Sequence, residues 1–523
     1  MSAYLSAAWN FIRARKRIIC IFAPVILGVL FMILCTVQLR QSIWFDESYS
    51  AYLTHFDYPK VWDLTAQDVH PPLYYFALKT WAHFFGHTDF AMRMLSVVFG
   101  AVAILFAYLW LKYKYGATAA ITATALLAIS PVFVRYGQEM RMYTMALAIV
   151  FAATYVLQLA IDNGKKRWWI LYAILLALGM WTHYFCALAW FAHLVYLIVI
   201  YRKKIFQKKI ILTYAGAVLL FVPWMPSLIR QTGSVQSGFW IPEISAKTFM
   251  DYWTETLVYQ SSTGLKSWLL LLALAAIVVI VALVVKYRAK LKMLISMMLV
   301  PLGLLILVSM PPLSPMFIPR YILFAIVSVA VISGVGLVIY ARDLPKRAAK
   351  KQVRRRAVIV AISFVILAST SIFGISSVYE TGNYNFSTNI KSSSKELYET
   401  IVTLDGGSNR AIICESEWLY YDLSFYSTKE HSVYFMNETV DYKYGSLYPL
   451  RDTYFGRIDD LDKFIGNRDS FWYITTIDEN TNQPAGKFPR EDWTIAEYST
   501  TQFNEHDSVY AIVKMVKEWY NNT

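Results

Sequence analysis

The sequence predicts an α-helical protein that crosses a membrane about eleven times and carries an extracytoplasmic C-terminal α/β domain. Only 16% of its 523 residues are charged, against roughly 25% in soluble proteins. Its apolar residues gather in long uncharged runs between residues 18 and 378. From Tyr379 onward the chain is polar and mixed, and it holds 23 of the 35 acidic residues. We therefore expect a transmembrane domain over 1–378 and a soluble domain over 379–523.

The apolar runs predict the membrane spans. A hydrocarbon core about 30 Å thick needs about 20 apolar residues in each helix. The first run has 22 uncharged residues, which is too long for the core of a signal peptide, so we expect it to stay in the mature protein. The predicted spans cover residues of about 18–39, 91–111, 117–134, 142–161, 168–183, 185–201, 210–228, 267–285, 293–310, 320–341 and 357–378.

The distribution of Lys and Arg predicts the orientation. With the N-terminus inside, the inner segments carry 26 Lys and Arg residues and two acids, whereas the outer segments before residue 379 carry ten of each kind. Positive charge favours the cytoplasmic side, so the N-terminus is expected there and the C-terminal domain outside. The net charge of +14 thus reflects topology and membrane lipids, and no nucleic-acid partner is expected.

Residues 71–85 are apolar but too short for a span, and they contain Lys79 and His83. Two prolines suit the first turn of a helix, so this segment predicts an amphipathic helix in the outer interface. A span here would invert every later loop and contradict the charge pattern.

The tail alternates between helix-like and strand-like stretches, which predicts an α/β domain. The helix-like stretches are about 393–404, 416–427 and 459–466, and the strand-like ones are 410–414, 432–436, 471–476, 493–500 and 508–514. Asp460-Leu461-Asp462 matches the acidic pair with which soluble sugar-nucleotide transferases hold a metal. It also stands at a predicted helix start, where acids are favoured, and we prefer that interpretation.

The first outer loop carries adjacent carboxylates, Asp46 and Glu47, among aromatic residues directly after the first span. A carboxylate at a membrane surface can be partly desolvated, which makes it a better base. The structural alternative is that the pair starts a short interfacial helix with Asp46 as N-cap. Further on, Asp68 and His70 precede the amphipathic helix. Asp68 could instead cap that helix, and His70 could simply pack.

The next outer edge holds Arg135, Glu139, Arg141 and Tyr143 between two spans with almost no loop. A guanidinium group binds phosphate oxygens in a bidentate fork, so these arginines suit a lipid phosphate substrate. Arg320, like Arg93 and Arg230, stands at a predicted helix end. An arginine that merely anchors a helix in the headgroup layer is the alternative for each of them.

Taken in order, these motifs resemble those of the GT-C glycosyltransferases, in the bacterial branch similar to protein O-mannosyltransferases and the lipid A aminoarabinose transferase. The resemblance covers about residues 15–345 and excludes the tail. The motifs are W-F-D-E, D-x-H-P-P-L-Y-Y, A-M-R-M, S-P-x-x-x-R-Y-x-Q-E-x-R-M-Y, T-H-Y-F and P-R-Y.

The resemblance implies a sugar donor carried on a polyprenyl phosphate and a lipid, glycan or protein acceptor. It implies Asp46 as catalytic base, with Glu47 beside it, in an inverting single displacement. The arginines would stabilise the departing phosphate. A divalent cation is left open, because His70 with a carboxylate could hold one but no spacing demands it. The four scattered cysteines form no CxxC pair, and they indicate neither a disulfide framework nor a zinc site. The expected substrate-binding residues are Asp68, His70, Arg135, Glu139, Arg141, Tyr143, His183, Arg320 and Tyr321.

Two other classes remain as alternatives. A lipid-linked polysaccharide ligase or polymerase would use a large later loop, and the outer loop of about 230–266 holds charged residues without a clear pattern. A lipid or sugar carrier would need ionisable residues inside its spans, and the predicted spans contain essentially none away from their ends.

Overall fold

The computed structural model describes residues 16–236, 241, 243–261, 265–311, 314–345, 347–381, 394–428, 432–442, 445–451, 453, 455–478, 483–484, 492–503 and 508–517. Contacts divide these residues into two compact units. The helical unit comprises the described parts of Met1–Leu39 and Arg93–Glu380, and the α/β unit those of Arg40–Met92 and Thr381–Thr523. The domain boundary after residue 378 stays a prediction. The contacts add that residues 40–92 associate with the tail, which the sequence did not indicate.

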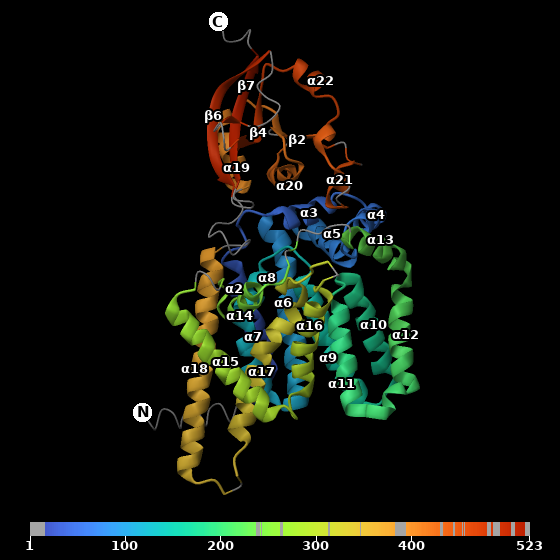
Figure 1. The fold of residues 1–523 in the computed structure, drawn as a ribbon, viewed down its shortest axis with the longest axis vertical. Coiled ribbons are helices and arrows are strands. Elements are labelled where there is room, and N and C mark those ends of the chain that lie inside the picture. Colours follow the sequence, from blue (N-terminus) through green and yellow to red (C-terminus); the bar gives the residue numbers. More distant parts are fainter. Residues whose placement is uncertain are drawn as a thin grey trace. The chain divides into compact units, whose positions relative to one another are not determined.

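The described part of the helical unit consists mainly of helices (Figure 1). Each of the eleven predicted spans lies on one or more of these helices. They are α2 (Lys16–Thr36), α6 (Asp89–Tyr115), α7 (Ala117–Ala128), α8 (Pro131–Gly137), α9 (Tyr143–Asn163), α10 (Lys166–Thr182), α11 (Cys186–Tyr201), α12 (Lys208–Phe221), α13 (Met225–Gln236), α14 (Ala246–Val258), α15 (Ser267–Tyr287), α16 (Lys292–Val308), α17 (Leu323–Arg342) and α18 (Lys350–Thr381). Single 3₁₀ turns include η3 (Pro319–Ile322), which leads into α17.

Within the described residues, seven helices are long and apolar enough to cross a membrane, or eight if α7 and α8 form one broken span. The structure therefore supports a membrane protein, and the eleven passes stay a prediction. The predicted span 117–134 is bent by 63° between α7 and α8. Pro131 explains the bend, because it lacks an N–H group and disfavours helical geometry at Ser130, which is extended.

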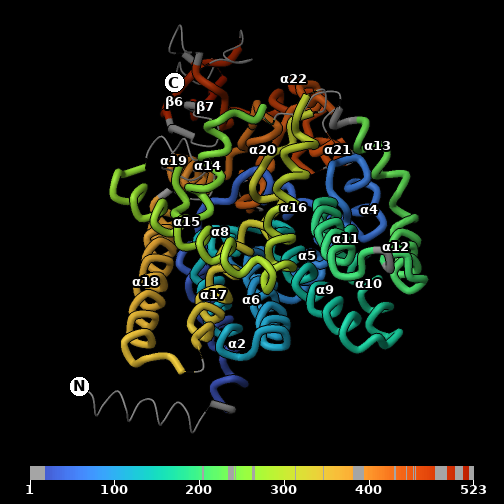
Figure 2. The backbone as a smooth tube through the Cα atoms, turned by 60° about the horizontal axis from the view of Figure 1, so that its bottom comes forward, coloured from blue at the N-terminus to red at the C-terminus, as the bar shows by residue number. Residues whose placement is uncertain are grey.

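The interior of the helical unit is built on α9 and α17, whose apolar windows are 83% and 89% buried. The corresponding windows of α2, α15 and α18 are only 28% buried, as expected for helices that face lipid. α16 and α17 run beside each other in Figure 1 and Figure 2. Gly334 of α17 packs against α7 so closely that a Cβ atom there would lie 2.6 Å from the backbone nitrogen of Ala123. Small residues permit such close helix packing in membranes.

The α/β unit begins with three helices from the first loop, α3 (Phe45–Leu53), α4 (Tyr58–Gln67) and α5 (Leu73–Phe85). α5 is the predicted amphipathic helix, with Tyr74, Tyr75 and Leu78 buried and Phe84 and Phe85 exposed. Its apolar exposed end is compatible with a membrane interface, which stays a prediction.

The tail supplies the sheet, whose order is β3-β2-β1-β4-β7-β6 with β5 beside β4. The strands β1, β2, β3 and β4 pair in parallel, and β7 joins β4 and β6 in antiparallel fashion; Figure 1 shows β4, β6 and β7. The strands are β1 (Ile412–Cys414), β2 (Val433–Met436), β3 (Arg457–Ile458), β4 (Ser470–Asp478), β5 (Gln483–Pro484), β6 (Trp493–Phe503) and β7 (Ser508–Lys517).

The tail helices are α19 (Ser394–Asp405), α20 (Glu417–Tyr426), the short α21 (Tyr448–Arg451) and α22 (Leu461–Gly466). A buried apolar core joins residues of the strands, including Ile413, Phe471 and Met515, with Leu461 and Ile465 of α22. Asp460 caps α22 by accepting a hydrogen bond from the Lys463 N–H group at 3.0 Å. This confirms the helix-start interpretation of Asp460-Leu461-Asp462.

Gly334→Ala should destabilise the helical unit, because the added methyl group meets backbone atoms that cannot rotate away. Overpacking of this kind costs about 1–3 kcal/mol, so the thermal unfolding midpoint in detergent should fall. Gly303→Ala is the matched control, since nothing lies within 4 Å of a Cβ atom at Gly303 of α16. Equal midpoints for the two variants would contradict this account of the α7–α17 contact.

Candidate active site

The two adjacent acids lie in the first turn of α3. The helix begins two residues earlier than the N-cap interpretation of Asp46 requires, so that interpretation is wrong. Trp44 is the N-cap residue, and its carbonyl accepts hydrogen bonds from the N–H groups of Glu47 and Ser48 at 2.8 and 3.0 Å. Asp46 is half-buried, whereas Glu47 is fully buried. Both carboxylates favour the positive end of the helix dipole, but only Asp46 keeps an accessible side chain.

Asp68 and His70 lie in the turn between α4 and α5. Asp68 is the C-cap of α4 and does not cap α5, so the capping alternative for this residue is also wrong. Pro72 occupies the N-cap of α5, and neither Pro71 nor Pro72 has an N–H group for a side-chain cap. The Asp68 carboxylate instead lies 3.4 Å from Nδ1 of the half-buried His70.

The polar cluster of the helical unit starts at the end of α8. Arg135 is 3% exposed, and its Nε donates to the Tyr259 hydroxyl at 3.0 Å. Its Nη1 lies 3.3 Å from the fully buried carboxylate of Glu139. Arg141 follows in the same turn and is 2% exposed. The backbone of Arg141 is held on both sides, since its N–H donates to the Glu139 carbonyl and its carbonyl accepts from Ser96.

A chain of aromatic rings connects this turn to the other predicted residues. The Tyr143 ring lies 5.3 Å from Tyr136 and 5.8 Å from His183. His183, at the end of α10, lies 5.6 Å from Tyr321 on η3. Tyr136 interacts electrostatically with Arg135, Glu139 and Arg320. The structure therefore gathers seven predicted residues into one cluster, here called the arginine cluster: Arg135, Glu139, Arg141, Tyr143, His183, Arg320 and Tyr321.

Sequence reasoning missed Tyr259 as a member of this cluster. It follows α14 with φ of 51°, a left-handed conformation that is uncommon for a bulky residue. Its N–H donates to the Glu255 carbonyl, and its hydroxyl reaches Arg135. Strained residues of this kind gather at functional sites. No sequence signal marks Tyr259, because it is one of 37 tyrosines and its partner is 124 residues away.

The net charge of the arginine cluster is positive. Burial raises the pKa of Glu255 to about 8, with a further contribution from Asp251 that Lys247 opposes. Glu255 is therefore mostly neutral at pH 7, and Glu139 is the cluster's own carboxylate. Burial also raises the pKa of Tyr259 to about 12, so its hydroxyl stays neutral. The arginine cluster thus contains three guanidinium groups and one carboxylate, and guanidinium groups are suited to binding anions.

The described residues contain no group of three or more His, Cys, Asp or Glu side chains that could hold a metal ion. The Asp68–His70 pair supplies two such side chains, so the structure leaves the predicted divalent cation open.

Comparison with known proteins adds family and fold evidence. Residues 69–228 match the sequence profile of the dolichyl-phosphate-mannose-protein mannosyltransferases. The crystal structure of ArnT from Cupriavidus metallidurans in the apo state aligns with a TM-score of 0.59 and 13% identity, covering 96% of this chain and 98% of that chain. The structure of the same protein bound to undecaprenyl phosphate aligns with a TM-score of 0.58 and 12% identity over the same shares. No curated protein sequence matches the chain.

These findings confirm the resemblance to GT-C glycosyltransferases that the sequence motifs indicated. The likeness to ArnT extends across nearly the whole chain, including the tail that the motifs did not cover. At this level of identity it shows a shared fold, and the chemistry of this chain has to be argued from its own residues.

Proposed function

We propose that this protein is a glycosyltransferase that moves a sugar from a polyprenyl phosphate carrier to an acceptor on the outer face of the membrane. The observation that carries the proposal is the arginine cluster: buried arginines gathered in a protein with several membrane-capable helices. A cluster of buried arginines in such a protein suits a ligand that combines an anionic headgroup with a long apolar chain. The undecaprenyl phosphate bound to ArnT supports this class of donor.

In the proposed reaction an acceptor hydroxyl attacks the anomeric carbon of the donor sugar. The new carbon–oxygen bond forms as the bond to the phosphate oxygen breaks, which inverts the anomeric configuration. Asp46 accepts the hydroxyl proton, and the electron pair leaves with the polyprenyl phosphate. Arg141 and Arg320, with Arg135, stabilise the developing phosphate charge. The sugar is a hexose or pentose, and the acceptor a lipid, a glycan or a protein.

The accessible member of the acidic pair suits the role of base better than its neighbour. Asp46 is half-buried and Glu47 fully buried on the same helix turn, so Asp46 is the one that an acceptor can approach. Glu47 and the Asp68–His70 pair would shape the surroundings. We also propose that the N-terminus is cytoplasmic and the tail extracytoplasmic, which the excess of Lys and Arg in the predicted inner loops supports.

Asp46→Asn should leave the fold intact and remove most transfer activity, because it keeps the size of the side chain and removes the base. Loss of a general base typically costs about 10²- to 10⁴-fold in rate. The measurement is transfer from a synthetic polyprenyl phosphate sugar. Asp57→Asn is the matched control, since Asp57 caps α4 and Asn caps helices equally well. Activity of Asp46→Asn within about threefold of the parent would exclude Asp46 as the base.

Arg141→Ala and Arg320→Ala should raise the KM for the donor more than they lower kcat, because a ground-state phosphate contact is lost. Hydrogen bonds to charged groups contribute about 1.5–3 kcal/mol, which corresponds to roughly 10- to 100-fold in KM. Arg230→Ala, at an exposed arginine of α13, should leave KM unchanged. If KM stays at the parental value in both variants, these arginines are helix anchors and not phosphate contacts.

A further inference from the structure

The helix that carries Asp46 packs against the C-terminal tail through a stripe of aromatic residues. Phe45, Tyr49 and Tyr52 are spaced so that they share one side of α3. Phe45 meets Trp418 of α20 edge to face with ring centroids 4.6 Å apart. Tyr52 meets Tyr421 of α20 at 4.9 Å in the same geometry. Asp46 directly follows Phe45 in the first turn of the same helix and is half-buried.

A buried hydrogen bond fixes this packing in one register. The Ser48 hydroxyl lies 2.5 Å from Oδ1 of Asp422, and both residues are 1% exposed. The same hydroxyl lies 2.9 Å from the Phe45 carbonyl in the first turn of α3. Ser48 is two residues from Asp46. A buried carboxylate is costly unless it is hydrogen-bonded, so Asp422 strongly favours the arrangement in which α3 presents Ser48 to α20.

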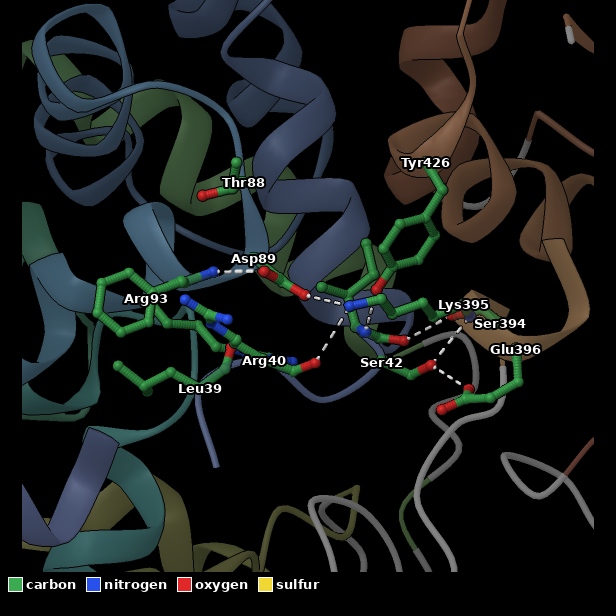
Figure 3. Close-up of polar contacts among 12 residues, drawn as sticks. Leu39, Arg40, Ser42, Thr88, Asp89, Arg93, Ser394, Lys395, Glu396 and Tyr426 are labelled. Carbon is green, nitrogen blue, oxygen red and sulfur yellow. Dashed lines mark hydrogen bonds and ion pairs between the residues drawn. The ribbon is translucent and has the colours of Figure 1, made fainter. Parts of the chain in front are cut away.

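The segment that leads into α3 is also held by the tail (Figure 3). The N–H of Ile43 donates to the Tyr426 hydroxyl at 2.9 Å, and its carbonyl accepts from the Ser394 hydroxyl at 3.0 Å. The Ser42 hydroxyl accepts from the Lys395 N–H and donates to Glu396. Both backbone groups of Ile43 are therefore paired with tail side chains just before the helix begins.

The tail also contacts Asp68, the acidic residue of the Asp68–His70 pair. Gly445 packs against the end of α4, and a Cβ atom there would lie 2.8 Å from the Cα atom of Asp68. The Tyr421 hydroxyl donates to the carbonyl of the adjacent Ser446 at 2.8 Å. Tyr421 thus contacts α3 on one side and supports the segment against Asp68 on the other.

We infer that α20 positions the acid-bearing helix for catalysis and that Asp422 is the residue through which it does so. The inference rests on the proposed function, because it takes Asp46 as the base. Asp422 acts through Ser48 and does not touch the reacting atoms, so it is a positioning residue. The C-terminal tail thereby becomes a working part of the enzyme, although none of the family-like motifs extends into it.

Asp422→Ala and Ser48→Ala should each lower kcat by about tenfold or more and leave the donor KM within about twofold of the parent. Asp422→Asn should recover most of kcat, because its amide oxygen still accepts from Ser48. The double variant Ser48→Ala with Asp422→Ala should be no worse than either single variant, since the two changes remove one interaction. Ser424→Ala is the control on α20, because among the described residues its hydroxyl bonds within the helix, to the Tyr421 carbonyl.

Hydrogen exchange provides a readout that does not depend on activity. Amide exchange over residues 42–53 should accelerate in Asp422→Ala and Ser48→Ala and stay parental in Ser424→Ala. Faster exchange with unchanged kcat would mean that the contact is only structural. Reduced kcat with unchanged exchange would mean that Asp422 affects catalysis without holding α3 in place. Either result would overturn the inference. If Asp422→Ala does not fold, the kcat and exchange rates of Ser48→Ala and Asp422→Asn test the inference. An inactive parent protein would contradict the proposed function but leave the exchange result interpretable.

Discussion

The burial of arginine side chains is the constraint on which the helical unit depends. Arg135 is 3% and Arg141 2% exposed, and a cation inside a protein is costly unless partners surround it. Arg135 meets that cost through the Tyr259 hydroxyl and Glu139. Tyr259 makes this contact from a left-handed conformation at the end of α14, and so links the end of α14 to α8. The excess of arginine over carboxylate in the arginine cluster is the reason for proposing a phosphate-bearing lipid as the ligand.

Much of the architecture could be predicted from the chain because it follows from local pattern. The apolar runs place helices at all eleven predicted spans, and alternation in the tail places its helices and strands. Asp460 begins α22 where the sequence expected a helix start. Residues from separate motifs, such as Arg135, His183 and Tyr321, lie in one connected cluster, although their role in a substrate site stays a prediction. The order of the motifs along the chain is informative about spatial neighbours, because proteins that share this order share the arrangement of their helices.

The features that could not be predicted from the sequence depend on contacts between distant segments. Tyr259 and Asp422 lack a local signal, since each matters only through a partner more than a hundred residues away. The start of α3 was misplaced because Trp44, a poor cap by residue type, accepts the first backbone bonds there. The association of residues 40–92 with the tail was hidden for the same reason. Phe45 and Tyr52, two of the aromatic residues around the acidic pair, pack on α20 of the tail.

The central claim is that the donor is a sugar on a single polyprenyl phosphate. Its most direct test is native mass spectrometry of the purified protein, offered a polyprenyl monophosphate sugar and a polyprenyl diphosphate oligosaccharide together. The account predicts that the mass of the protein increases by the mass of the polyprenyl monophosphate sugar. Once an acceptor has taken the sugar, the protein should retain the free polyprenyl phosphate. Preferential binding of the diphosphate oligosaccharide would contradict the account and would indicate a polysaccharide ligase or polymerase.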